Sequence, residues 1–286
     1  MAVVVVTDSS SRLPEELRDR WAIRQVPLHI LLGDLDLRDG VDAVPDDLHA
    51  RDDATTAGAT PAELSEAYRR ALADSGGDGV VAVHLSAALS GTVGAARAAA
   101  ADIGPTVRVI DSQSVAMNTG FVALAAARSA AGGADLDTVA RAAAASVRRN
   151  HGFVVAHRLD NLRRSGRISG AAAWLGTALA LKPLLRTEEG KLVLAQRVRT
   201  AGKAVAAMID GVCEIVNAQP ADRSAALAVH HVADPDGAAR VAGVLAERLP
   251  ACAPALVTEL GPVLALHVGA GALAVCIELG VELGAA

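Results

Sequence analysis

Residues 79–92 read GVVAVHLSAALSGT, an apolar β-branched run followed by a polar segment that leads into an alanine-rich stretch. An apolar run of this length, ended by turn residues, is typical of a buried strand that precedes a helix. The same order recurs at residues 3–6, followed by Asp8 and three serines, and at residues 107–110, followed by Asp111 and Ser112. Three such units predict a mostly parallel, Rossmann-like α/β sheet with flanking helices.

A helix start stands out between the first two units. Thr60-Pro61-Ala62-Glu63 has the pattern of a capping box, with proline at the first helical position. Apolar residues then follow at the spacing of one buried helix face. The preceding segment, residues 55–59, is predicted to be a loop in which Thr56 can direct its hydroxyl at a ligand, although an ordinary turn residue is the alternative.

The pattern changes after residue 150. Strands are expected at residues 151–156, 192–198, 225–231, 255–260 and 272–278, with a hairpin turn at Glu188-Glu189-Gly190. We therefore predict two domains, an N-terminal α/β domain over residues 1–150 and a C-terminal mixed-sheet α/β domain over residues 151–286.

Composition excludes several classes of protein. Of the 286 residues, 52% are hydrophobic and 21% charged, which is too apolar for a disordered chain and too charged for a membrane bundle. We expect no membrane span and, by default, a cytoplasmic location. A net charge of −5 with 2% aromatic residues argues against nucleic acid as a partner.

Ser90-Gly91-Thr92 follows the predicted buried strand directly. Hydroxyls and helix N-terminal N–H groups would gather there, at the edge where open α/β sheets bind anionic ligands. An anion site is one interpretation, and a simple helix cap by Ser90 is the other. His267 lies beside Gly269 and Gly271, which allow close approach of a ligand. Taken alone, however, a histidine in such a position is more often structural.

Positive charge is concentrated on one predicted loop, at Arg163, Arg164 and Arg167. This loop is either a solvated surface or a contact for a partner or phosphate. Arg199 follows a predicted strand, where a surface salt bridge is its plain interpretation.

No metal site is predicted. His230 and His231 precede Asp234, but consecutive strand residues point to opposite faces, so both imidazoles are unsuited to bind one ion. The three cysteines are far apart and have neither disulfide nor metal-ligand spacing.

With these motifs in hand, the sequence resembles the DegV family, the fatty-acid-binding subunits of bacterial fatty acid kinases. The motifs that carry the resemblance run nearly end to end: residues 7–10, 38–42, the threonine loop at Thr56, residues 86–92, 110–112, 162–169, 182–183, 198–199 and 267–271. Two positions depart from the family pattern. Ala57 stands where a serine is usual, and Ser165 replaces a glycine.

The resemblance implies two α/β domains of DegV type with one long-chain fatty acid at their interface. Its acyl chain would occupy an apolar tunnel, and its carboxylate would be held by Thr56 and Ser90, with Arg199 and His267 nearby. No cofactor is implied. The chain would present the fatty acid to a separate ATP-dependent fatty acid kinase, which forms an acyl phosphate for phospholipid synthesis.

This carrier function leaves the catalytic chemistry to the partner kinase, and the chain has no Gly-x-x-x-x-Gly-Lys phosphate loop. Two alternatives stay open. One is a serine acyl hydrolase with Ser90 as nucleophile, His267 as base and Asp111 as acid, although the segment lacks a Gly-x-Ser-x-Gly elbow. The other is a carrier of a different anionic lipid.

Overall fold

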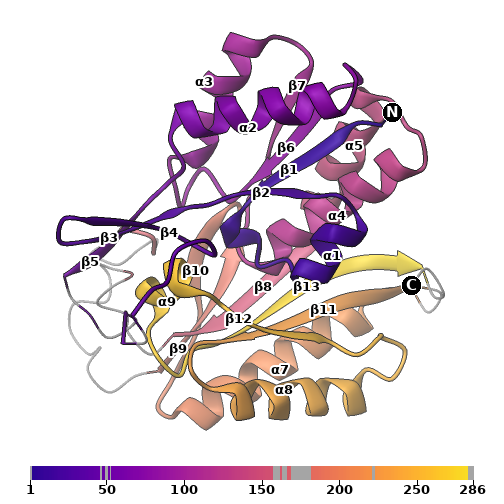
Figure 1. Cartoon of the computed structure of the whole chain (residues 1–286). Coiled ribbons are helices and arrows are strands. Elements are labelled where there is room, and N and C mark those ends of the chain that lie inside the picture. Colours follow the sequence, from indigo (N-terminus) through magenta and orange to yellow (C-terminus); the bar gives the residue numbers. More distant parts are fainter. Residues whose placement is uncertain are drawn as a thin grey trace. The chain divides into compact units, whose positions relative to one another are not determined.

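The computed structural model describes residues 2–45, 47–48, 51, 53–156, 162, 166–168, 182–220 and 223–282. The chain divides into two compact units (Figure 1). The first unit comprises residues 1–45 and 52–148, and the second comprises residues 46–51 and 149–286. The expected fold class is confirmed, because one unit contains a parallel sheet and the other a mixed sheet.

The elements of the first unit are, in chain order, β1 (Val4–Asp8), the short 3-10 helix η1 (Ser9–Ser11), α1 (Glu15–Arg20), β2 (Arg24–Val26), β3 (His29–Leu32), β4 (Leu35–Arg38), β5 (Ala54–Ala57), α2 (Pro61–Asp74), β6 (Val80–His84), α3 (Thr92–Ile103), β7 (Val107–Asp111), α4 (Met117–Ala131) and α5 (Leu136–Val147).

A four-stranded parallel sheet with the order β2-β1-β6-β7 forms the centre of this unit. Helices α2 and α3 pack together over one face of the sheet, and α4 and α5 pair over the other (Figure 1). All five residues of β6 are buried, as expected for a strand covered on both faces. The three predicted strand–helix units therefore form one sheet, with their carboxyl ends at one edge.

The capping box predicted at the start of α2 is present. The Thr60 side chain accepts the Glu63 N–H, and the Glu63 carboxylate accepts the Thr60 N–H. Leu64 and Tyr68, one turn apart on α2, are fully buried against the sheet.

A second, antiparallel sheet of the first unit, β4-β3-β5, was not expected from the sequence. The prediction of a loop at residues 55–59 is wrong in part, because β5 includes Thr56 and Ala57. Strands of four residues give little periodicity, and β5 exists because it pairs with β3, which is distant in the sequence.

The elements of the second unit are β8 (Asn150–Val155), β9 (Lys182–Glu188), β10 (Lys191–Val198), α7 (Ala201–Asn217), β11 (Arg223–His231), α8 (Pro235–Arg248), β12 (Leu256–Glu259), α9 (Pro262–Val268) and β13 (Leu273–Glu282).

Its sheet has the order β10-β9-β8-β13-β11-β12, antiparallel except where β12 runs parallel to β11. Helices α7 and α8 cover one face, and their apolar sides form the core with β8, β11 and β13 (Figure 1). The hairpin predicted at Glu188-Glu189-Gly190 connects β9 to β10.

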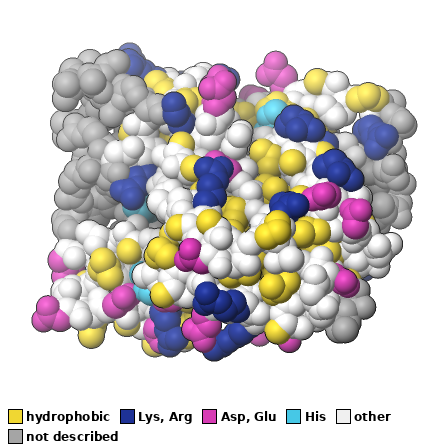
Figure 2. Space-filling view, turned by 90° about the horizontal axis from the view of Figure 1, so that it is seen from above, with side chains coloured by type: hydrophobic (Ala, Val, Ile, Leu, Met, Phe, Trp, Pro, Cys, Tyr) yellow, Lys and Arg dark blue, Asp and Glu magenta, His cyan; other side chains and the backbone are white. Residues whose placement is uncertain are grey.

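Among the described residues, no helix is both long and apolar enough to cross a bilayer. On the face shown in Figure 2, the coloured basic and acidic side chains are interspersed.

Candidate functional site

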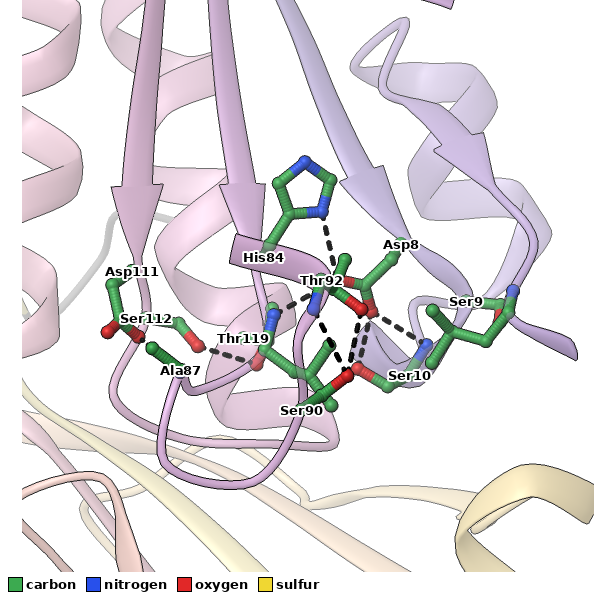
Figure 3. Close-up of polar contacts among 12 residues, drawn as sticks. Asp8, Ser9, Ser10, His84, Ala87, Ser90, Thr92, Asp111, Ser112 and Thr119 are labelled. Atoms are coloured by element: carbon green, nitrogen blue, oxygen red, sulfur yellow. Dashed lines mark hydrogen bonds and ion pairs between the residues drawn. The ribbon is translucent and has the colours of Figure 1, made fainter. Parts of the chain in front are cut away.

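The carboxyl ends of β1, β6 and β7 form a continuous polar edge of the parallel sheet (Figure 3). Asp8 ends β1, and its Oδ2 accepts the Leu85 N–H just beyond β6 at 3.0 Å. Asp111 ends β7, and its Oδ1 accepts the Ala87 N–H at 3.3 Å. The segment after β6 is therefore held from both neighbouring strands.

A buried network fixes the end of β6 more firmly. His84 Nδ1 lies 3.0 Å from Asp8 Oδ2, and His84 Nε2 lies 2.7 Å from the hydroxyl of Tyr68 on α2. All three side chains are inaccessible to solvent. Burial, with a smaller contribution from the charge of Asp8, raises the pKa of Tyr68 well above its ordinary value. Tyr68 therefore stays a neutral phenol, and the network ties α2 to the two strands.

The serines that follow β1 are engaged in the same edge. Asp8 Oδ1 accepts hydrogen bonds from the N–H and the hydroxyl of Ser10. Ser9 Oγ donates to Asp39 Oδ2 at 2.7 Å and accepts the Leu28 N–H at 3.0 Å. Burial raises the pKa of Asp39, although Arg12 and the Ser9 hydroxyl oppose this. These side chains organise the edge and are committed to internal hydrogen bonds.

Ser90 lies where the segment after β6 enters α3, and it is half-buried. Its Oγ is 2.9 Å from Thr92 Oγ1 and accepts the Thr92 N–H at 3.3 Å. Gly91 is the N-cap of α3, and Thr92 is its first residue. Ser90 therefore accepts the backbone N–H of Thr92 without being the N-cap itself. Ser90 is the more exposed residue of the pair, because Thr92 is completely buried.

The segment that carries Thr56 lies against the one that carries Ser90. A Cβ atom placed on Gly58 would lie 2.6 Å from Thr92 Oγ1 and 3.4 Å from Ser90 Oγ. Only glycine permits this approach without a shift. Thr56, two residues earlier on β5, is half-buried and pairs in register with Ile30 of β3.

Asp111 and Ser112 serve the turn after β7. Asp111 Oδ1 also accepts the Gln113 N–H at 2.9 Å, and Ser112 Oγ lies 3.0 Å from Thr119 Oγ1. Asp111 thus accepts two backbone N–H groups and holds the turns after β6 and β7.

His267 belongs to the second unit and occupies the last turn of α9, a helix that the sequence analysis missed. Burial and the nearby positive charge of Arg167 lower the pKa of His267 to about 4. The imidazole is therefore neutral at pH 7. Arg167, predicted as a partner contact, thus also influences an imidazole of its own unit.

The remaining residues predicted for the site are arginines. Arg199 is exposed between β10 and Thr200, which caps α7. Arg163 and Arg164 lie outside the described residues. Thr56 and Ser90 thus belong to the first unit, and Arg199 and His267 to the second.

Two of the three residues considered for a metal, His230 and Asp234, have local hydrogen-bond partners. His230 Nδ1 lies 2.8 Å from Thr258 Oγ1, and Asp234 caps α8 by accepting the Gly237 N–H. Within the part of the chain that the structure describes, no three His, Cys, Asp or Glu side chains are grouped to hold a metal ion.

Comparison with known proteins identifies the family to which the chain belongs. The family described as "Uncharacterised protein, DegV family" matches residues 2–279, almost the whole chain. The chain belongs to the DegV family. A DegV domain-containing protein of Mycobacterium tuberculosis is 71% identical over 280 residues, covering 98% of each chain.

Two solved DegV structures resemble the present one closely. A DegV family protein from Thermus thermophilus, described by its fatty acid binding, is 32% identical with a TM-score of 0.89, covering 98% of this chain and 100% of the other. DegV from Bacillus subtilis, described as a fatty acid binding protein, is 27% identical with a TM-score of 0.85, covering 97% and 99%.

Sequence reasoning grouped Thr92 with Ser90 in one candidate anion site but gave it no separate role. It assigned no role to Gly58 or to the Asp8–His84–Tyr68 network. A histidine at the end of an otherwise apolar strand was a usable signal, because a buried imidazole needs hydrogen-bond partners. Gly58 gave no such signal, since its role depends on a contact with a segment more than thirty residues away.

Proposed function

We propose that this protein binds a long-chain fatty acid and that the hydroxyls of Thr56 and Ser90 donate hydrogen bonds to its carboxylate. The observation that carries the proposal is the close approach of Gly58 to Ser90 and Thr92, which brings the two hydroxyl-bearing segments together at the polar sheet edge. The fatty acid binding of the DegV proteins from T. thermophilus and B. subtilis supports the choice of ligand.

The tail and the carboxylate of such a ligand contribute differently to the free energy of binding. Burial of a tail of about sixteen carbons is worth on the order of 10 kcal/mol before the costs of association. A carboxylate taken from water needs hydrogen bonds to replace its hydration, and hydroxyl groups supply them. The tail then provides affinity, and Thr56 and Ser90 provide orientation.

Arg199 and His267, which the family resemblance implies near the head group, stay part of the proposal. At pH 7 His267 is neutral, because its pKa is about 4. A neutral imidazole can donate one N–H to a carboxylate.

Titration calorimetry tests the head-group assignment. Ser90→Ala and Thr56→Ala should each weaken fatty acid binding by about 1 to 3 kcal/mol, the cost of leaving a buried charged acceptor short of one partner. Thr55→Ala is the matched control, because Thr55 is exposed and adjacent strand residues point to opposite faces. Wild-type affinity in both test variants would refute the assignment.

The ligand class has its own test. Mass spectrometry of lipid extracted from the purified protein, without added lipid, should detect long-chain fatty acids. If another anionic lipid were the dominant species, the alternative function, a carrier of that lipid, would be favoured.

We further propose that the bound fatty acid is presented to a separate ATP-dependent kinase, which forms the acyl phosphate. Arg163, Arg164 and Arg167 are the proposed contacts, since a basic segment on a chain of net charge −5 suits steering towards an acidic partner. Arg163→Glu with Arg164→Glu should slow acyl-phosphate formation, most at low salt, and leave fatty acid affinity unchanged. Equal rates across a salt series would remove these arginines from the proposal.

The serine hydrolase alternative gains no support from the surroundings of Ser90. The hydrogen bonds of its Oγ within the described residues are with Thr92, not with an imidazole. Steady turnover of a chromogenic acyl ester that Ser90→Ala abolishes would nevertheless overturn the pure carrier function.

A further inference from the structure

The pairing of Ser90 with Thr92 has a directional consequence. A serine hydroxyl carries one proton and two acceptor lone pairs. The Thr92 N–H occupies one lone pair of Ser90 Oγ at 3.3 Å, and Thr92 Oγ1 lies within hydrogen-bond distance at 2.9 Å. The proton between the two oxygens can belong to either residue.

The two directions differ in what Ser90 can offer a ligand. If Ser90 donates to Thr92, its only proton is used inside the protein. If Thr92 donates to Ser90, both lone pairs of Ser90 are filled and its own proton is available to an outside acceptor. A carboxylate accepts hydrogen bonds only, so its arrival selects the second direction, and each bond in the chain polarises the next.

We propose that Thr92 is a positioning residue that makes Ser90 a dedicated hydrogen-bond donor to an anionic head group. Thr92 is suited to this role because it is completely buried at the first position of α3. Its backbone N–H and its hydroxyl act on the same oxygen from one residue. This inference rests on the proposed fatty acid binding and adds the source of discrimination between charged and neutral head groups.

Gly58 completes the arrangement. A Cβ atom at this position would lie 2.6 Å from Thr92 Oγ1, closer than real Cβ contacts, so a side chain here would displace the hydroxyl. The constraint is one of space, because Gly58 is not among the glycines with positive φ. The absence of a side chain at Gly58 therefore leaves room for the Thr92 hydroxyl beside Ser90.

The experiment compares two ligands, a long-chain fatty acid and the primary alcohol of the same chain length, by displacement of a fluorescent fatty acid. Thr92→Val keeps the shape of the side chain and the backbone N–H but removes the hydroxyl. We expect the preference for acid over alcohol to fall severalfold, because Ser90 keeps its proton but the lone pair that Thr92 filled can then accept the hydroxyl proton of the alcohol. Thr92→Ser retains the hydroxyl and should keep the preference within about twofold of the wild type.

A pair of glycine variants provides an independent arm. Gly58→Ala should reproduce the loss of preference expected for Thr92→Val. Gly94→Ala is its matched control, because Gly94 lies on the same helix as Thr92 and a Cβ there meets nothing within 4 Å. Thermal unfolding of each variant shows whether it is folded, and Gly58→Ala tests the proposal if Thr92→Val is not.

The outcomes separate this inference from the function on which it rests. If the wild-type protein binds neither ligand, the proposed function fails. If the wild type prefers the acid and Ser90→Ala removes that preference, but Thr92→Val and Gly58→Ala keep it, the role of Thr92 is refuted. A loss of affinity for acid and alcohol alike in Thr92→Val also refutes it, because that result indicates a structural role only.

Discussion

Two histidines with restricted access to water, His29 in the first unit and His267 in the second, have opposite shifts in pKa. His29 is 7% exposed on β3, and its ring nitrogens lie 2.7 Å from Asp36 Oδ1 and 3.1 Å from Glu63 Oε2. Burial lowers the pKa of His29, but the hydrogen bond to Asp36 and the charge of Glu63 outweigh it, so the net shift is upward. His267 has Arg167 nearby instead, and its pKa falls to about 4.

The difference shows that burial by itself favours the neutral imidazole in both units and that the partners decide the outcome. Two carboxylates favour the cation on β3, whereas a guanidinium disfavours it at the end of α9. The presence of a histidine in the sequence therefore does not tell in which direction its pKa is shifted. At pH 7 a carboxylate ligand would therefore find in His267 a neutral donor and no positive charge.

The largest expected effect is on stability at acidic pH. The folded pKa of His267 is about 4 against an ordinary 6.5, so the unfolded chain binds a proton first as the pH falls. The contribution of His267 to the free energy of unfolding should be fully present above pH 6.5 and should decrease as the pH falls to 4. The loss should be on the order of 2 kcal/mol, because water still screens a half-buried ring.

Urea unfolding of the wild type and His267→Gln across this pH range measures the contribution. All other titrating groups are shared, so the difference between the two proteins isolates His267. Parallel curves for the two proteins would mean that the imidazole titrates normally.

A smaller effect concerns the cause of the low pKa of His267. Arg167→Gln should raise this pKa, but it should stay below 6.5, because burial is the larger cause. Titration of the histidine ring protons by NMR measures it directly. Arg240→Gln, a change at an exposed arginine of α8 in the same unit, serves as the control and should leave the His267 signal unmoved.

The smallest expected effect is at His29. Asp36→Asn should lower the pKa of His29, because it removes the strongest of the interactions that raise it. The raised pKa contributes stability that is fully present below pH 6.5 and is lost as the pH rises through the folded value. Since Asp36 is 59% exposed, that contribution should be only a few tenths of a kcal/mol.

The control for this change is Asp34→Asn, at an exposed aspartate in the turn of the same hairpin. It changes the net charge equally without touching the imidazole. An equal shift of the His29 signal in both variants would indicate a general charge effect and contradict a specific role of Asp36.

The elements predicted well from the sequence share a property, which is that their signal is local. The apolar run at residues 80–84 and the capping box at Thr60 each specify an element within a few residues of chain. Repeated strand–helix order was enough to predict a parallel sheet, because short crossover connections leave few other topologies. Motif order likewise carried the family resemblance.

The failures have the opposite property. Strand β5, which carries Thr56, exists through its pairing with β3, and helix α9 carries His267 in a segment of seven residues. Elements this short have weak intrinsic preference, and tertiary contacts decide them.

The sequence alone was enough to predict two α/β halves and a polar edge of the parallel sheet. It also indicated Ser90 and Thr56 as candidate ligand-binding residues. Only the tertiary structure decided which hydroxyl Ser90 faces, why residue 58 is a glycine, and in which direction the pKa of each histidine shifts. The physical reason is that periodicity and capping act between neighbours in the chain. Hydrogen-bond direction, close packing and pKa depend on atoms brought within a few ångströms by folding, and the chain order does not encode those distances.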